Sequence, residues 1–287
     1  MLSAFTTQYL PGLLATGLYL ASTALLLHAI TGTQSHPMTA NGPNTGLDTG
    51  GLNTGRGRIV WGLAMIAALL HALALVYSSF KADGLNLSFF NSLSVTSWFT
   101  VILLLLISMG RPVITLGLIV FPISALVLGL SLKFAGQQAL AIEPQVQWHV
   151  LISVIAYALL TMAAGQSVLV SMQNNRLRSH RPGGFLQALP SLKLMEQVLS
   201  QLLIASFIML LLALITGFIF LDDLFAQRLV HKTTLSILAL VLLAILLIGH
   251  YRFGWRGQKA ARMTLGAYIA LLLGYFGSKF VKELVLA

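Results

Sequence analysis

Long apolar segments separated by short polar stretches make up most of this chain. A transmembrane helix needs about 20 mostly apolar residues. Eight segments have this character: Leu10–Ile30, Ile59–Phe80, Ser94–Met109, Val113–Leu132, Trp148–Val170, Gln197–Leu221, Thr233–His250 and Met263–Lys282. The pattern predicts an all-α polytopic membrane protein with about eight transmembrane helices and no soluble domain. Arg111-Pro112 alone separates the third segment from the fourth, which predicts a tight helical hairpin.

The first apolar segment is followed by the longest polar stretch of the chain. We do not expect this segment to be a signal peptide, because it lacks a basic n-region and a clear small-x-small cleavage site. The loop Thr31–Arg58 is rich in Gly, Asn and Thr, and Asn44–Gly55 nearly repeats itself. This composition is typical of a flexible linker. We therefore divide the chain into residues 1–58, one helix plus a flexible loop, and residues 59–287, a seven-helix membrane domain.

Composition agrees with the apolar pattern and excludes several classes of protein. The 287 residues are 57% hydrophobic and 8% charged, whereas a soluble domain is about 45–50% apolar and about 25% charged. The absence of cysteine excludes disulfides, thiolate metal sites and thiol redox chemistry. The net charge of the chain is +10. In a membrane protein such an excess of Lys and Arg is typically found in the cytoplasmic loops. We therefore expect no nucleic-acid partner.

The basic residues between the spans predict the orientation of the chain, because cytoplasmic loops are enriched in Lys and Arg. One side carries eleven of them: Arg56, Arg58, Arg111, Arg176, Arg178, Arg181, Lys193, Arg252, Arg256, Lys259 and Arg262. The other side carries six: Lys81, Lys133, Arg228, Lys232, Lys279 and Lys282. The first side is predicted to be cytoplasmic, so both termini are predicted to face outward.

His71 is the clearest polar residue within a span. It lies near the middle of the second segment, surrounded by Leu and Ala. Polar groups in the membrane are costly and are therefore candidates for function. A neutral imidazole there needs a partner for its N–H or a metal for its lone pair. Position alone leaves two interpretations open, a ligand and a histidine hydrogen-bonded to a neighbouring helix.

His149 begins the fifth segment at the predicted outer face. Ser153 and Tyr157 follow at i+4 and i+8, which places the three on one helix face. This stripe could support a polar cofactor edge or orient the imidazole. The alternative is an interfacial belt formed with Trp148.

The remaining candidate histidines lie at helix ends. His250 ends the seventh segment and is followed by Trp255 and Arg256, which are also ordinary membrane anchors. His231 precedes Lys232 on the predicted outer face, where it could join His149.

The absence of certain residues and motifs excludes further classes of protein. No carboxylate lies in the middle of a span, which argues against a proton- or sodium-coupled transporter. No motif for nucleotide binding or hydrolysis occurs, so we do not expect an enzyme. Histidine without cysteine leaves haem-iron ligation as plausible chemistry.

Several stretches together resemble a known family. They are Leu70–Leu75, Asn86–Leu93, His149 through Tyr157-Ala158, Lys232–Ser236, Gly249–Tyr251, Gly254–Gly257 and Tyr275–Ser278. In combination they resemble the YpjD/HemX-like membrane proteins of the cytochrome c assembly superfamily, to which the haem-handling CcsA and CcmC proteins belong. The resemblance runs from about Ile59 to the C-terminus.

The resemblance implies roles for three histidines. His149, followed by Ser153 and Tyr157, looks like the first external haem-ligating histidine of the superfamily. His250 resembles a membrane-embedded histidine, although its register differs by about one turn, and His71 matches a histidine typical of the YpjD-like branch. The tryptophan-rich external haem motif is absent from Leu221–His231, and no second external histidine follows the last span. A haem-binding, transport or accessory role therefore fits better than direct ligation of haem to an apocytochrome.

These considerations combine into one expectation, a multi-pass inner-membrane protein that binds haem b and assists haem delivery or cytochrome c assembly. We expect His149 as an iron ligand, with His71 or His231 as the second. The expected partners are haem, the lipid bilayer and other cytochrome c maturation or membrane proteins. The expected haem surroundings also include His250, Ser153, Tyr157, Trp255 and Arg256. The alternatives are a haem-free accessory or scaffold, part of a metal-resistance exporter and, third, a substrate transporter.

Overall fold

The computed structural model describes residues 2–32, 55–81, 84–111, 113–134, 143–178, 189–220 and 230–285. Within these ranges, eight helical segments are long and apolar enough to cross a membrane, which confirms the predicted all-α polytopic class. The α-helices are α1 (Leu2–Gly32), α2 (Gly55–Ser79), α3 (Phe89–Gly110), α4 (Gly117–Phe134), α5 (Pro144–Arg178), α6 (Leu192–Phe220), α7 (Val230–Phe253), α8 (Gly257–Leu272) and the short α9 (Ser278–Phe280). Most of the loop Thr31–Arg58, including the near-repeat as far as residue 54, lies outside the described residues, and the loop's last four residues, Gly55 to Arg58, belong to α2.

Several helices extend beyond the apolar segments from which they were predicted. The largest difference is in α5, which covers Pro144–Arg178 where the apolar segment covers Trp148–Val170. Helix α3 begins at Phe89, five residues before Ser94. Hydropathy marks the part of a helix that lies in hydrocarbon, whereas the backbone hydrogen bonds of a helix continue into the polar interface.

Short non-α elements join or extend the helices. Strands β1 (Phe80–Lys81) and β2 (Gly84–Leu85) form an antiparallel hairpin between α2 and α3, which the hydrophobic pattern does not predict. A 3-10 turn, Ile114–Leu116, leads into α4. The last span continues beyond α8 through two π-helical turns, η4 (Leu273–Gly277) and η5 (Val281–Val285), that flank α9. Single π-helical turns occur often at functional sites.

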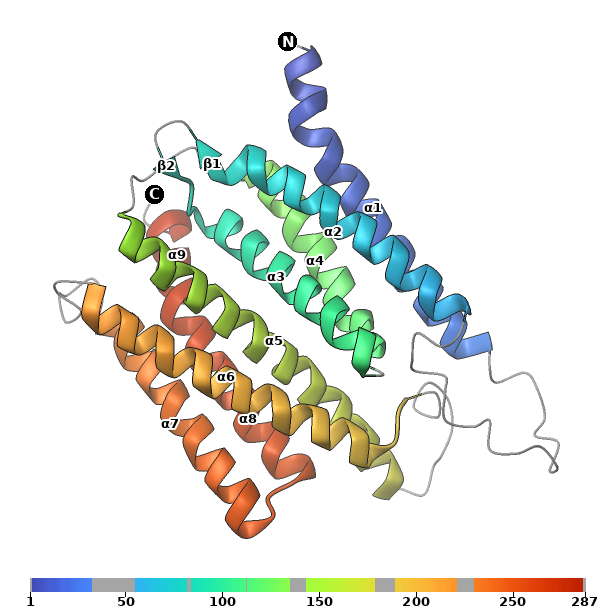
Figure 1. The fold of residues 1–287 in the computed structure, drawn as a ribbon, viewed down its shortest axis with the longest axis vertical. Helices are drawn as coiled ribbons and strands as arrows, with labels where there is room; N and C mark the ends of the chain where they lie inside the picture. The colour runs from blue at the N-terminus through green and yellow to red at the C-terminus, as the bar shows by residue number, and fades with distance from the viewer. Residues whose placement is uncertain are drawn as a thin grey trace.

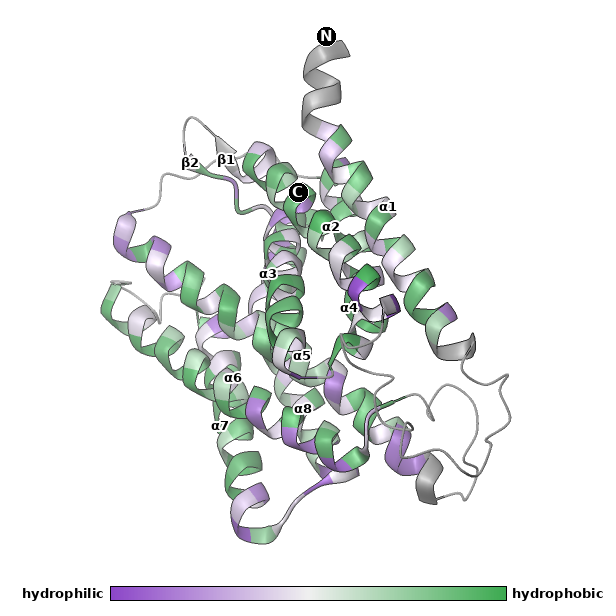
Figure 2. Ribbon diagram, turned by 45° about the vertical axis from the view of Figure 1, so that its right-hand side comes forward, coloured by the Kyte–Doolittle hydropathy of each residue, from purple (hydrophilic) through white to green (hydrophobic). Residues whose placement is uncertain are grey.

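Small residues allow the helices to approach closely. The buried face of α2 carries Ala64, Ala67, Ala68 and Ala74 around His71, and such small residues are typical of helix interfaces in membranes. Large apolar residues on other faces point outward. Figure 2 shows that most residues along the helices are apolar, as expected where the surrounding medium is lipid.

The helices run back and forth, so consecutive connections lie at alternate ends of the bundle (Figure 1). Helix α1 packs on α2 and α4, α3 packs on α4 and α5, and α5 packs on α6 and α8. Helices α3 and α5 therefore form the centre of the molecule. The N- and C-terminal ends lie toward the same end as the β-hairpin.

Candidate functional site

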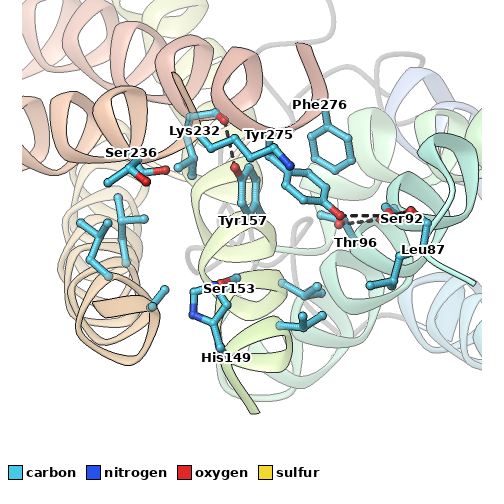
Figure 3. Close-up of a pocket in the computed structure, with 18 of the residues that line it drawn as sticks. Leu87, Ser92, Thr96, His149, Ser153, Tyr157, Lys232, Ser236, Tyr275 and Phe276 are labelled. Carbon is cyan, nitrogen blue, oxygen red and sulfur yellow. Dashed lines mark hydrogen bonds between the residues drawn. The ribbon is translucent and has the colours of Figure 1, made fainter. Parts of the chain in front are cut away.

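A cavity of about 280 Å3 lies between α3, α5, α6, α7 and the last span (Figure 3). It is near the end of the bundle that carries the β-hairpin, because its lining includes His149 near the start of α5 and Lys232 in the first turn of α7. Its walls are mainly apolar, with hydroxyl groups, one imidazole and one ammonium among them. The lining residues are Leu87, Ser92, Val95, Thr96, His149, Val150, Ser153, Val154, Tyr157, Leu210, Ala213, Leu214, Gly217, Lys232, Thr233, Ser236, Leu271, Tyr275 and Phe276.

His149 is held in the cavity wall by a hydrogen bond to α6. Its Nδ1 lies 3.1 Å from Oγ1 of Thr216. The Thr216 hydroxyl also lies 2.9 and 3.1 Å from the carbonyls of Leu212 and Ala213, and when its single proton is donated to one of them it accepts from the imidazole. In that arrangement Nδ1 carries the proton, and Nε2 keeps its lone pair. This is how metal-binding histidines are commonly oriented, with one nitrogen donating and the other left for the metal.

Gly217 provides the space that the His149 ring occupies. A methyl group at this position would lie 3.1 Å from Cε1 of the imidazole and 3.9 Å from Nε2. Any larger residue would displace the ring, so the Thr216-Gly217 pair fixes both the orientation and the location of His149.

The stripe predicted on α5 lies partly on the cavity. Ser153 and Tyr157 both line it, and the Tyr157 hydroxyl donates to the carbonyl of Leu271 at 3.0 Å. The Tyr157 ring packs against the rings of Tyr275 and Phe276, with centroids 5.9 and 5.6 Å away. These contacts join α5 to the last span, at the end of α8 and in the π-helical turn η4, and form part of the cavity wall.

Two lysines lie close to Tyr275. Nζ of Lys232 lies 5.2 Å from the centroid of the Tyr275 ring and lines the cavity. Nζ of Lys279 donates to Oγ of Ser92 at 3.1 Å and to the Tyr275 hydroxyl at 3.4 Å. Ser92 and Tyr275 are thus connected through an ammonium at the edge of the cavity.

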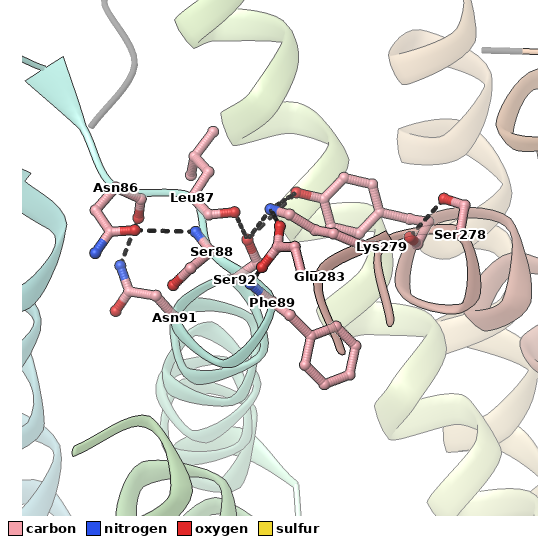
Figure 4. Close-up of polar contacts among 10 residues, drawn as sticks. Asn86, Leu87, Ser88, Phe89, Asn91, Ser92, Ser278, Lys279 and Glu283 are labelled. Carbon is pink, nitrogen blue, oxygen red and sulfur yellow. Dashed lines mark hydrogen bonds and ion pairs between the residues drawn. The ribbon is translucent and has the colours of Figure 1, made fainter. Parts of the chain in front are cut away.

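The same edge is closed by contacts between the end of the last span and the start of α3 (Figure 4). Oε2 of Glu283 accepts the backbone N–H of Phe89 at 2.7 Å, and Oε1 lies 3.8 Å from Nζ of Lys279. A carboxylate at the first turn of a helix binds N–H groups that have no partner within the helix and complements the helix dipole. We call these contacts of Lys279 and Glu283 with Phe89 and Ser92 the α3 latch.

His71 does not line the cavity. It is completely buried where α1, α2 and α3 meet, and both ring nitrogens have partners. Nδ1 lies 3.3 Å from the Tyr19 hydroxyl, and Nε2 lies 2.9 Å from Oγ of Ser94. His71 and His149 therefore occupy separate environments, each with its own hydrogen bonds.

His250, Trp255 and Arg256 lie at the opposite end of the bundle from the cavity, in the turn between α7 and α8. Nδ1 of His250 donates to the carbonyl of Trp255 at 3.0 Å. Gly254 and Gly257 have positive φ angles of 64° and 58°, which glycine adopts at least cost. The Gly-Trp-Arg-Gly motif is thus a helix–helix turn, and Arg256 is exposed within it.

His231 is exposed on the first turn of α7. Its neighbour Lys232 lines the cavity, but His231 does not. Of the predicted site residues, the structure brings together His149, Ser153 and Tyr157, and it places His71, His231, His250, Trp255 and Arg256 elsewhere.

The lining residues fit the chemical requirements of a porphyrin. Apolar walls suit its ring, hydroxyl and ammonium groups suit its propionates, and the lone pair on Nε2 of His149 suits its iron. No cluster of three or more His, Cys, Asp or Glu residues suited to a bare metal ion occurs among the described residues. Haem requires no such cluster, because the porphyrin supplies four of the ligands to iron.

The eight membrane-length helical segments of the described residues and the cavity define the class, a polytopic membrane protein with a site at one end of its helix bundle. The profile of the family described as Cytochrome C assembly protein matches residues 61–286. The chain belongs to this family, which confirms the resemblance of the sequence to the cytochrome c assembly superfamily.

Individual relatives agree with this assignment. The chain is 28% identical to the inner membrane protein YpjD of Escherichia coli K12 over 226 residues, 77% of this chain and 86% of YpjD. It is 41% identical over 140 residues to an uncharacterized 28.8 kDa protein in the nifR3-like 5' region of Azospirillum brasilense. That match covers 48% of this chain and 52% of the Azospirillum protein. No solved structure matches the chain.

Several residues of the cavity did not emerge from the sequence as candidates. Thr216 and Gly217 interrupt an otherwise apolar run in α6, and that interruption is the signal that could have identified them. Tyr275 and Lys232 occur in the stretches that resemble the family, but nothing in the sequence places them beside the His149 helix.

Proposed function

We propose that this chain is a haem-binding protein of the inner membrane that assists haem delivery or cytochrome c assembly. His149 is the axial ligand, and the cavity between α3, α5, α6 and α7 receives the porphyrin. Ser153, Tyr157 and the apolar walls surround it. Haem held at this site is cargo rather than a permanent part of the protein. Membership of the cytochrome c assembly family and the name of the relative YpjD, an inner membrane protein, support the class and the membrane.

One observation carries the proposal, the hydrogen bond between Nδ1 of His149 and Thr216. Among the described residues Nε2 has no side-chain hydrogen-bond partner, so a neutral imidazole can offer its lone pair to a ligand in the mainly apolar cavity. Both nitrogens of His71, by contrast, are engaged, and coordination of iron would cost His71 one of these bonds. We therefore assign ligation to His149 without His71.

The test is the absorption spectrum of the full chain, purified in detergent and titrated with haemin, in the oxidised and the dithionite-reduced states. The wild type is expected to show a sharp Soret band and reduced α and β bands. His149→Ala is expected to weaken haemin binding at least tenfold. Thr216→Val, which removes the acceptor for Nδ1, is expected to weaken it roughly tenfold, since partners of metal-binding histidines typically contribute 10–100-fold in affinity.

His250→Ala is the matched control, because the Nδ1 of His250 also donates a hydrogen bond, but at the far end of the bundle. It is expected to bind haemin like the wild type. A wild type that stays colourless after haemin titration and gel filtration would overturn the proposal and favour the haem-free scaffold. Binding that is unchanged in His149→Ala would overturn the assignment of the ligand.

A further inference from the structure

Among the described residues that line the cavity, Lys232 is the only charged one. It lies in the first turn of α7 and is half-buried. The ion pair recorded among the described residues is Lys279–Glu283, and Lys232 takes no part in it. Its Nζ lies over the face of the Tyr275 ring, 5.2 Å from the centroid.

A half-buried ammonium in an apolar wall has lost part of its hydration. A cation–π contact compensates for this loss only partly. An anion brought into the cavity would restore a charge-assisted hydrogen bond, which is about twice as strong as a neutral one. The cavity therefore favours a ligand with an anionic group over a purely apolar one.

The position of Lys232 within the cavity defines the shape of this ligand. Figure 3 shows Lys232 and His149 at different ends of the group of lining side chains, with Tyr157 between them. Tyr157 is eight residues after His149, a rise of about 12 Å along α5. The cavity walls are mainly apolar and include Val154 and Phe276. The ligand thus has an apolar body in the middle and a negative group at the Lys232 end.

We propose that Lys232 binds the carboxylate of an amphipathic ligand in this cavity, and that for a porphyrin this group is a propionate. The porphyrin part of the proposal rests on the proposed function, whereas the carboxylate part rests on Lys232 alone. A fatty acid has the same chemistry, a carboxylate on an apolar body, and is the second source that the experiment must separate.

The experiment uses metal-free protoporphyrin IX, because without iron His149 contributes no ligand bond. Binding of protoporphyrin IX and of its dimethyl ester to the full chain in detergent is measured by porphyrin fluorescence, with protein-free micelles as the blank. Lys232→Gln is expected to weaken binding of protoporphyrin IX about tenfold, the effect of one hydrogen bond to a charged group. It is expected to leave binding of the ester unchanged, and Lys232→Arg is expected to stay within about threefold of the wild type.

Lys133→Gln is the matched control. Lys133 also lies over an aromatic ring, with Nζ 5.1 Å from the Phe134 centroid, but it does not line the cavity. This variant is expected to bind both porphyrins like the wild type. Equal weakening of protoporphyrin IX and the ester by Lys232→Gln would overturn the proposal, because only the acid carries the carboxylate. Unchanged binding of the acid would overturn it as well.

Haemin and oleate separate this proposal from the proposed function. Haemin binding that depends on His149 but not on Lys232 would leave the function standing and reject the carboxylate site. Oleate is titrated by its displacement of a fluorescent fatty acid. Oleate that binds through Lys232, in a protein that binds no porphyrin, would support the carboxylate site with a lipid source and reject the haem function. A wild type that binds none of these probes would overturn both proposals.

Discussion

At the residue scale, hydrogen bonds distinguish histidines that the sequence cannot distinguish. His71 and His149 both lie in or beside apolar spans, and position alone leaves each with a ligand and a structural interpretation. The difference depends on residues distant in sequence. Tyr19 and Ser94 contact the two nitrogens of His71, whereas among the described side chains Thr216 contacts Nδ1 of His149 and none contacts its Nε2. A sequence pattern shows neighbours on one helix but not the partner across a helix interface.

His71 gives a prediction at this scale, because its two partners are buried with it. His71→Leu would leave the hydroxyls of Tyr19 and Ser94 without their imidazole partner in an apolar environment. We expect a loss of about 1–3 kcal/mol in the free energy of unfolding, measured by SDS titration of the protein in detergent. Haemin affinity in the folded protein is expected to stay unchanged.

The control is the triple variant Tyr19→Phe, His71→Leu and Ser94→Ala, which removes all three polar groups. Most of the stability is expected to return, because replacing every partner by an apolar group leaves no unsatisfied hydroxyl. If His71→Leu instead abolished the haem spectrum at full stability, His71 would be the ligand that the sequence allowed.

At the scale of the elements, the hydrophobic pattern predicts the eight spans but neither their ends nor their irregular turns. The number of spans follows from hydropathy, because every helix that spans a lipid bilayer needs about 20 mostly apolar residues. The ends depend instead on partners from other parts of the chain. Helix α3 begins at Phe89, where Glu283 accepts the Phe89 N–H, and no local pattern connects residues so far apart. The π-helical turn that carries Tyr275 is equally invisible to hydropathy.

The α3 latch gives a prediction for two elements that meet at the cavity. Glu283→Ala removes the acceptor of the Phe89 N–H and the anion beside Lys279. We expect a local loss of about 0.5–2 kcal/mol, the effect of removing a helix cap. Amide hydrogen exchange is expected to become faster at Phe89 and in Val281–Val285, as measured by mass spectrometry.

Two further variants make this test specific. Glu283→Gln keeps an acceptor oxygen and is expected to lie between Glu283→Ala and the wild type. Lys282→Ala changes the exposed neighbour on the same turn and is expected to exchange like the wild type. Unaltered protection of Phe89 in Glu283→Ala would show that the carboxylate does not hold the start of α3.

At the scale of the whole molecule, eight crossings place both ends of the chain toward the same end of the bundle. The cavity with His149 lies at that end, whereas the turn with Arg256 lies at the other. The excess of Lys and Arg predicts that the Arg256 end is cytoplasmic. The site would then open toward the outer face of the membrane, the side on which we expect a haem-delivery site to act.

The absence of cysteine allows this orientation to be measured without any background thiol. Gln145 and Asn175 are exposed, uncharged residues at opposite ends of α5. Thirty residues of helix separate them by about 45 Å, more than the roughly 30 Å of a bilayer core. In intact cells whose outer membrane admits the reagent, an impermeant maleimide is expected to label Gln145→Cys, and Asn175→Cys only after the inner membrane is permeabilised. Because both sites are on one helix and neither substitution changes a charge, the reverse pattern would mean that the chain is inverted and that the cavity faces the cytoplasm.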